Sequence, residues 1–396
     1  MTIDFFNNLK SGKIKRNDIL IVKDGATTGK VSFVQKDFPF DRASINEHVF
    51  RIEIDPRNGF SKYVYLFLKS SEGKKQILND FRGATVGGIS RQFIESTKIP
   101  LPSLNDQIRI ATVLTRAEKL IAKRKESIKA LDELLKSTFL DMFGDPVRNE
   151  RGWEKKPLSI LGSLDRGVSK NRPRNAPELL GGKYPLIQTG EVSNAGTYLS
   201  KYSQTYSEIG FKQSKMWKAG TLCITIAANI AKTSILTFDA CFPDSVVGFI
   251  TNKDEANVLY VHHLFGFFQK ILEKNAPQAA QKNINLEILR NLQVPKPPLP
   301  LQNQFAAIVE KVEVLKVKYT QSLTALENLY GALSQRAFKG ELDLSKIPSC
   351  ETAILTQIQP PVVEPFKRIP RPKFSEQYKG NTPLLPLKIA AHEPRD

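Results

Sequence analysis

The sequence predicts an α+β protein with two repeated domains joined by two long antiparallel helices of the coiled-coil type, in pseudo-twofold arrangement. Three observations carry this prediction: motifs of the first half recur in the second, an apolar heptad pattern follows each copy, and paired prolines precede each heptad pattern. The expected parts are a first domain at 1–103 that begins part-way through the repeat, a central helix at 104–143, a second domain at 144–300, a distal helix at 301–340 and a flexible, proline-containing tail at 341–396.

Three stretches of the first half recur in the second. They are Ile19–Val22 on Leu222–Thr225 at an offset of 203, "YVYLFL" (63–68) on "YVHHLF" (260–265) at 197, and "ISRQFIESTKIPLPSL" (89–104) on "INLEILRNLQVPKPPL" (284–299) at 195. Just beyond the third stretch, Gln107 is matched with Gln304. Small changes of offset indicate loop insertions within one shared architecture.

The segment "KDGATTGKVSF" (23–33) has the look of a phosphate-binding loop. Such a loop needs four residues between its glycines and a hydroxyl residue after the lysine, whereas three residues separate Gly25 from Gly29 and Val31 follows Lys30. The second copy, "AANIAKT", has no glycine at all. The apolar stretches on either side favour a turn between two buried strands.

Each copy is followed by apolar residues in alternating steps of three and four, which is the spacing of a coiled-coil seam. The two series match at a constant offset of 198, with Arg124 and Ser322 in the one polar slot. That slot suits either a register-setting polar pair or an arginine that reaches out to water. The predicted seam residues are Ile110, Leu114, Ile121, Ile128, Leu131 and Leu135 in the first helix, and Val312, Leu315, Leu326, Leu329 and Leu333 in the second.

Prolines and glycines set the expected ends of these helices. "IPLPSLNDQ" and "VPKPPLPLQNQ" cannot be helical, so each helix begins just after them, and Gly144 and Gly340 follow their last turns. About 35 helical residues span roughly 50 Å, or about one and a half turns of B-DNA. A rigid spacer of that length suits two DNA-reading domains on a two-part site.

Basic charge is concentrated in the two repeated blocks. Residues 1–103 carry 17 basic and 11 acidic side chains, and residues 151–300 carry 19 and 11, so these blocks hold +6 and +8 of the net charge of +18. This distribution is typical of proteins that bind nucleic acid, and the partner expected here is double-stranded DNA. A generally basic, soluble surface is the alternative.

Four stretches carry the candidate DNA-contacting residues. The cations of "LDRGVSKNRPRNAP" suit phosphate contact or base reading in a groove. In "PLIQTGEV", glutamine can pair with adenine and glutamate with cytosine, although Thr189 also suits strand-end packing. "NAPQAAQKNIN" offers Gln278 and Asn283, the latter also a possible helix cap. With the turn at 23–30, the predicted residues are Arg166, Lys170, Arg172, Arg174, Gln188, Thr189, Glu191, Gln281, Lys282, Lys23, Thr27, Thr28 and Lys30.

Several classes of function are disfavoured. The four histidines are scattered away from the three cysteines, so neither a metal site nor a catalytic triad is expected, and no glycine-rich cofactor loop follows a strand. No apolar run reaches 18 residues, which argues against a membrane span. The odd, dispersed cysteines favour free thiols in a reducing cytoplasm.

The chain resembles the specificity subunits of type I restriction–modification systems. The matching stretches are "ILIVKDGATTGKVSFV", "RGATVGGISRQFIESTKIPLPSLNDQ", "LLKSTFLDMFGDPVRNERGWEKKPL", "YPLIQTGEV", "INLEILRNLQVPKPPLPLQNQ" and "LSQRAFKGEL", which together cover nearly all of 13–343. The resemblance implies two target-recognition domains that each read half of a split DNA sequence. It implies a non-catalytic chain without a cofactor, two methyltransferase subunits docked on the helices, and restriction–translocase subunits that join them.

One departure from that pattern concerns the first domain. The segment 152–216 of the second domain has almost no counterpart before "RNDILIV". A misassigned gene start, a truncated chain, or a missing half supplied by another chain would each explain this. The alternative function is therefore a partial specificity subunit that acts as a coiled-coil adaptor and binds DNA only non-specifically.

Overall fold

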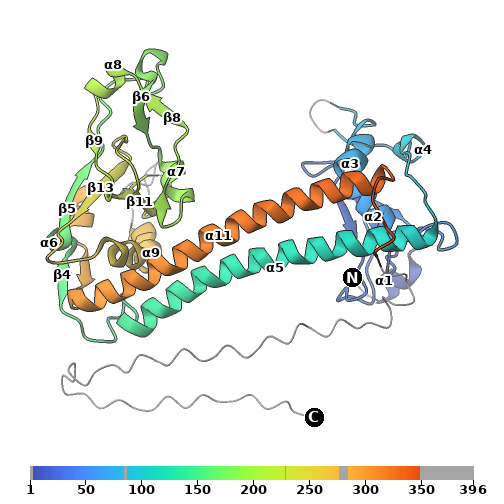
Figure 1. The fold of residues 1–396 in the computed structure, drawn as a ribbon, viewed down its shortest axis with the longest axis horizontal. Helices are drawn as coiled ribbons and strands as arrows, with labels where there is room; N and C mark the ends of the chain where they lie inside the picture. The colour runs from blue at the N-terminus through green and yellow to red at the C-terminus, as the bar shows by residue number, and fades with distance from the viewer. Residues whose placement is uncertain (1–2, 84–86, 228, 276–283, 348–396) are drawn as a thin grey trace, which may run out of the picture.

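The computed structural model describes residues 3–83, 87–227, 229–275 and 284–347 of the chain. Two long helices, α5 (Leu104–Phe143) and α11 (Leu299–Phe338), form a rod with a mixed α/β lobe at each end (Figure 1). We call residues 3–103 the first lobe and residues 144–298 the second lobe. Each lobe has its own buried apolar cluster, and the rod contributes residues to both.

The two helices run side by side in opposite directions. Glu118 of α5 lies beside Tyr330 of α11, and Asp132 of α5 lies beside Lys316, so residue numbers rise in one helix as they fall in the other. Ser103 caps α5 by accepting a hydrogen bond from the Asp106 N–H at 3.2 Å. The expected helices were 104–143 and 301–340. The first is confirmed, whereas α11 begins and ends two residues earlier than expected. It can begin at Leu299 because Pro300 falls in its first turn, where proline is tolerated.

The first lobe is built on a small antiparallel sheet in the order β2-β1-β3. Its helices cover the face that holds Ile19 and Ile21, which are fully buried. The elements are α1 (Ile3–Asn8), β1 (Ile19–Val22), β2 (Val31–Phe33), β3 (Val49–Ile52), α2 (Ser61–Lys69), α3 (Ser71–Leu78) and α4 (Phe93–Ser96).

The second lobe has a five-stranded sheet in the order β5-β13-β10-β11-β7 and a four-stranded sheet in the order β8-β6-β12-β9. The four-stranded sheet projects away from the rod (Figure 1). The elements are β4 (Lys155–Pro157), α6 (Leu158–Leu161), β5 (Gly162–Arg166), η1 (Pro177–Leu179), β6 (Leu180–Leu186), α7 (Thr189–Asn194), β7 (Tyr198–Leu199), β8 (Gln204–Tyr206), α8 (Glu208–Lys212), β9 (Met216–Trp217), β10 (Leu222–Thr225), β11 (Thr233–Leu236), β12 (Ala240–Cys241), β13 (Val246–Thr251), α9 (Val258–Asn275), α10 (Leu286–Arg290) and β14 (Gln293–Pro295).

The three central strands of the two lobes pair in the same way. In the first lobe Ile19 of β1 lies between Phe33 of β2 and Ile52 of β3. In the second, Leu222 of β10 lies between Ile235 of β11 and Phe249 of β13. These registers agree with the strand alignment read from the sequence.

The segment 23–30 is a turn between β1 and β2, as predicted. Gly25 and Gly29 have φ angles of 89° and 78°, which only glycine adopts readily. The Gly29 N–H donates to the Val22 carbonyl at 2.8 Å. In the second lobe Ala231, with φ of 58°, donates to the Thr225 carbonyl at the same distance. The two glycines are therefore explained by the backbone conformation of the turn.

A buried glutamine at the start of each long helix corrects the sequence alignment. The Gln107 carboxamide accepts from the Phe60 N–H at 2.9 Å and donates to the Pro102 carbonyl at 3.0 Å. Gln302 does the same with the Asn257 N–H at 2.9 Å and the Pro297 carbonyl at 2.8 Å. The counterpart of Gln107 is thus Gln302, whereas Gln304 is exposed and the match made to it was wrong.

The helices themselves correspond at an offset of 195, because they begin at Leu104 and Leu299. The predicted offset of 198 was wrong by three residues, which is one step of the heptad pattern. As a result Leu315 and Leu329 lie outside the seam, with 42% and 52% of their surface exposed. Among the other predicted seam residues, Ile110, Leu114, Leu135 and Val312 are buried, and Ile121, Ile128, Leu131, Leu326 and Leu333 are half-buried.

The polar slot of the heptad pattern is filled by a cross-helix contact. The Arg124 guanidinium carbon lies 4.4 Å from the ring centroid of Tyr319 on the opposite helix. This geometry is a cation–π interaction. Arg124 therefore stays on the seam, although its partner is Tyr319 rather than Ser322.

Equivalent glutamates attach the rod to each lobe. Glu118 accepts from Lys69 of α2 at 2.6 Å and from the Tyr330 hydroxyl at 3.2 Å. Glu313, 195 residues later, accepts from the Thr197 hydroxyl at 2.7 Å and from Lys316 at 2.9 Å.

Near Lys316, burial lowers the pKa of His263 to about 4, so this histidine is neutral at physiological pH.

None of the helices in the described residues has the length and apolar character needed to cross a bilayer. In that same part of the chain, no group of three or more His, Cys, Asp and Glu side chains is placed to hold a metal ion.

The buried glutamine generates a stability prediction. Gln302→Leu would leave the Asn257 N–H and the Pro297 carbonyl without partners inside the protein, which costs about 1–3 kcal/mol per buried group. We expect the free energy of unfolding in urea to fall by about 2–4 kcal/mol. The exposed neighbour supplies the control: Gln304→Leu should change it by less than about 0.5 kcal/mol. Equal effects of the two substitutions would contradict the corrected alignment.

Candidate nucleic-acid interface

The predicted basic loop of the second lobe is held in place by residues far away in the sequence. The Gln213 carboxamide oxygen accepts from the Lys170 N–H at 2.5 Å and from the Asn171 N–H at 3.0 Å. The Ser214 hydroxyl donates to the Val168 carbonyl at 2.7 Å. The backbone of 168–171 is therefore fixed, and the long side chains it carries project from a defined position.

The four predicted cations of this loop fall into two groups. Arg172 and Arg174 share the carboxylate of Asp244, and Arg172 also donates to the Ser169 carbonyl at 2.6 Å. Arg166 and Lys170 form no ion pair within the described residues. The two unpaired cations are thus the ones available to a phosphate without breaking an internal contact.

The residues predicted at the strand-to-turn edge are Gln188, Thr189 and Glu191, and they form the start of α7. The Glu191 carboxylate accepts from the Gln188 N–H at 2.7 Å and from the Ser203 hydroxyl at 2.6 Å. Glu191 therefore serves as a helix cap, and both of its oxygens have internal partners. The side chains of Gln188 and Thr189 are half-buried at the same edge.

Strand β8 connects this edge with the basic loop. Gln204, at its start, accepts from the Gln188 amide at 3.4 Å, and the Tyr206 hydroxyl, at its end, donates to Ser169 at 3.4 Å. Two residues of strand cover about 7 Å. The structure therefore brings Gln188 and the 166–174 loop to neighbouring positions on one lobe.

In the first lobe the predicted residues lie on the turn between β1 and β2. Thr27 and Lys30 are exposed, and Lys23 lies 3.9 Å from the Asp24 carboxylate. The Thr28 hydroxyl donates to the Gly25 carbonyl at 2.7 Å, so it stabilises the turn. Gln281 and Lys282, together with Gln278 and Asn283, lie outside the described residues.

Two further cations, Lys215 and Arg290, join the basic loop. Both approach Asp165, at 3.8 Å and 3.4 Å, and Lys215 also lies 4.1 Å from the centroid of the Trp217 ring. Their separation from Asp165 by 50 and 125 residues leaves no local signal in the sequence. They add positive charge at the end of β5, next to Arg166.

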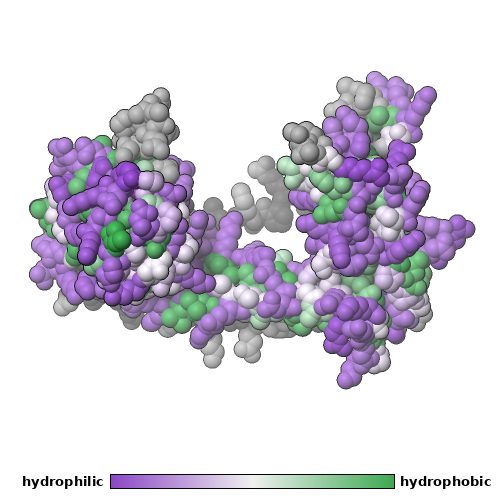
Figure 2. All heavy atoms as spheres, turned by 90° about the horizontal axis from the view of Figure 1, so that it is seen from above, coloured by the Kyte–Doolittle hydropathy of each residue, from purple (hydrophilic) through white to green (hydrophobic). Residues whose placement is uncertain are grey.

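Seen from above, the two lobes present largely hydrophilic surfaces on either side of a gap that the rod spans (Figure 2). The rod consists of 40-residue helices, so it is about 60 Å long. The candidate residues of the two lobes are therefore held apart by a fixed distance and cannot converge on one small ligand.

Comparison with known proteins adds the family. The family model of the type I restriction modification DNA specificity domain matches residues 1–130 and 150–358. The chain belongs to this family. Members serve as the specificity subunits of type I restriction–modification systems, which are non-catalytic because the catalytic activities reside in other subunits.

Several specificity subunits are similar over most of their length. The MjaVIII specificity subunit of Methanocaldococcus jannaschii is 21% identical over 76% of this chain and 73% of its own, and the EcoDI subunit of Escherichia coli is 22% identical over 71% and 70%. The solved S subunit from M. genitalium has a TM-score of 0.53 at 15% identity, covering 83% of this chain and 84% of its own. A structure of the type I R-M system has the same TM-score at 17% identity over 85% of both chains.

The two unpaired cations of the basic loop, Arg166 and Lys170, generate a prediction about DNA binding. Arg166→Ala with Lys170→Ala should weaken DNA binding. It should also make the negative slope of log affinity against log salt less steep, by about 0.9 for each phosphate contact that is lost. If either residue reads a base, discrimination at that position should also fall by about 1–3 kcal/mol.

Fluorescence anisotropy over a salt series, with competitor DNA, measures both quantities. The control is Lys129→Ala with Lys136→Ala, two exposed lysines on α5 that make no ion pair within the described chain. An unchanged affinity and slope for the Arg166 and Lys170 variant would remove this loop from the DNA interface.

Proposed function

We propose that this chain reads a bipartite DNA target, one half with each lobe, and directs methyltransferase and restriction subunits to it. The lobes act as two target-recognition domains, repeated about a pseudo-twofold axis, and α5 and α11 act as a coiled-coil spacer. The observation that carries the proposal is the rod itself, whose ends are built into the cores of both lobes. A separation fixed in this way selects a fixed gap between half-sites.

The dimensions support this reading. Helices of about 60 Å correspond to roughly 18 base pairs at about 3.4 Å each, so each lobe can meet a separate part of the duplex. The basic loop at 166–174 and the turn at 23–30 would supply phosphate contacts. Gln188 and Thr189 are the candidates for base contacts in the second lobe.

Exposed leucines on the rod support two copies of a partner. Leu120 and Leu134 of α5 are exposed to a similar extent as Leu315 and Leu329 of α11, and they are related to them by the offset of 195. Each half of the rod thus carries one leucine from each helix. Two equivalent apolar patches are what two identical methyltransferase subunits would require.

The unequal lobes favour the alternative in part. The first lobe, as described, has only a three-stranded sheet, whereas the second carries an additional four-stranded sheet next to the candidate residues. A partial specificity subunit that acts as a coiled-coil adaptor and binds DNA only non-specifically would fit that asymmetry. Retention of sequence-specific binding in high salt and excess competitor DNA separates the two functions.

The spacer role can be tested by lengthening the rod. Seven residues inserted between 126 and 127 and seven between 321 and 322 preserve the heptad pattern and add about 10 Å. Mapping of methylated sites in cells with the partner subunits should show a gap about three base pairs longer. Insertion into one helix alone is the control, because it mismatches the pair. An unchanged gap would contradict the spacer.

The docking surface can be tested by stoichiometry. Leu134→Asp with Leu315→Asp should abolish one methyltransferase site and leave the patch of Leu120 and Leu329, because charge is excluded from apolar interface centres. Native mass spectrometry should then show one methyltransferase subunit in place of two. Retention of two would show that these leucines lie outside the interface.

A further inference from the structure

The first lobe has an open edge where the second lobe has a closed one. In the second lobe, β5 pairs with the outer edge of β13, and β4 pairs with β14. In the described part of the first lobe, β3 is the last strand of its sheet. The segment 98–100, 195 residues before β14, has no strand partner among the described residues.

The corresponding side chains are also less buried in the first lobe than in the second. Phe50, Ile52 and Ile99 are half-buried, and their counterparts Val247, Phe249 and Val294 are fully buried. Close to this edge Ile94 and Leu101 have 55% and 64% of their surface exposed. An unpaired strand beside exposed apolar side chains is a surface that natural proteins normally cover.

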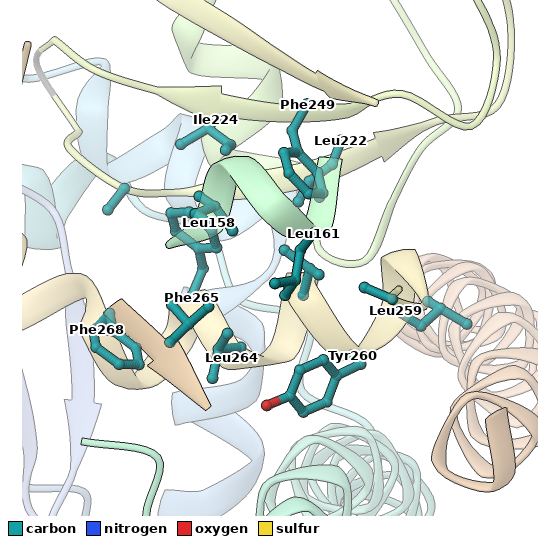
Figure 3. Packing of buried hydrophobic residues seen from close by; sticks show 14 of the residues in the cluster. Leu158, Leu161, Leu222, Ile224, Phe249, Leu259, Tyr260, Leu264, Phe265 and Phe268 are labelled. Carbon is teal, nitrogen blue, oxygen red and sulfur yellow. The ribbon is translucent and has the colours of Figure 1, made fainter. Parts of the chain in front are cut away.

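In the second lobe the cover is the short unit β4-α6-β5. Leu158 and Leu161 of this unit point between the strand residues Leu222 and Phe249 and the residues of α9 (Figure 3). Leu164 joins the same cluster. This unit follows α5 in the chain, beginning 12 residues after Phe143.

The chain that follows α11 packs on the first lobe in the way that the chain following α5 packs on the second. Val147, after α5, packs on the core of the second lobe, and Leu342, 195 residues later, packs on the core of the first. Leu344 packs there as well. Twelve residues beyond Phe338, the last residue of α11, is Cys350. A covering unit in the equivalent place would therefore start near residue 350.

Five residues near that point repeat part of the apolar pattern of the covering unit, at an offset of 194, whereas Leu158 falls on Thr352. "ILTQI" (354–358) has the spacing of "ILGSL" (160–164), so Leu355 and Ile358 stand for Leu161 and Leu164. The family match also continues to residue 358. Thr356 replaces Gly162, where a Cβ would lie 2.3 Å from the Ile250 carbonyl, so the match concerns the apolar anchors and not the strand register.

We propose that residues 350–358 of this chain, which lie outside the described residues, dock on the open edge of the first lobe. Leu355 and Ile358 are the anchors, and β3 with Phe50, Ile52 and Ile99 is the receiving surface. The first lobe is then completed by the end of the chain, in the way that β4-α6-β5 completes the second. This docking does not depend on DNA or on partner subunits.

Hydrogen exchange of the full chain tests this. Leu355→Asp with Ile358→Asp should speed amide exchange in peptides covering Val49–Ile52 and Phe93–Ile99 by roughly tenfold or more, because the anchors can no longer enter an apolar surface. Leu384→Asp with Leu385→Asp, in the same tail, is the matched control and should leave these peptides unchanged. Exchange in α2 should be the same in all proteins, which verifies that the lobe remains folded.

Three results would overturn the proposal. The first is identical exchange in the anchor variant and in the unmodified chain. The second is unaltered protection of the same peptides in a protein that ends after Pro348, which would assign the cover to another segment. The third is protection that appears only with rising protein concentration and a dimer mass, which would assign it to a second copy.

Discussion

Burial of the ends of α5 and α11 inside both lobes is the interaction on which the rest of the structure depends. Phe139 and Phe143 of α5 pack against Tyr260 and Phe305 with ring centroids 4.9–5.6 Å apart. At the opposite end, Phe338 of α11 packs 5.2 Å from Phe67. Each aromatic ring buries a large apolar area, so neither lobe can leave the rod without exposing its own core. The spacing of the lobes is therefore a property of the cores.

Polar groups at the same junctions define where each helix sits. Gln107 and Gln302 each satisfy one backbone donor and one backbone acceptor, and Glu118 and Glu313 each receive a donor from a lobe. A helix displaced by one turn would leave these groups unpaired in a region of low dielectric constant, which is costly. Apolar packing holds the rod and lobes together, and these polar contacts make one alignment better than its neighbours.

This rigidity bears on how the chain would meet DNA. The candidate contacts lie on loops and on a helix start, which are positioned by sheets attached to the rod. Internal pairing divides them: Asp244 and Ser203 engage Arg174 and Glu191, whereas Arg166, Lys170 and Lys30 form no ion pair within the described residues. Among the described residues the β3 edge of the first lobe has no further strand, so the two ends of the rod carry unequal lobes.

Local chemistry was sufficient for much of this description. Prolines and glycines mark the start and end of α5, the strand registers follow from alternating apolar residues, and the spacing of Gly25 and Gly29 indicates a turn. These features depend on neighbours in the chain, so a sequence displays them. The repeat, and with it the family resemblance, could also be recognised in the sequence, because its motifs are continuous stretches of the chain.

Only the tertiary structure decided how the two helices align with each other and which of the cations form ion pairs. A shift of three residues keeps most apolar positions of a heptad pattern apolar, so 198 and 195 look alike until Gln302 is seen with its backbone partners. The pairing of Arg172 and Arg174 with Asp244 spans about 70 residues, and the approach of Arg290 to Asp165 spans 125. Such contacts depend on how strands are ordered in space, and that order is set by the packing of the whole lobe.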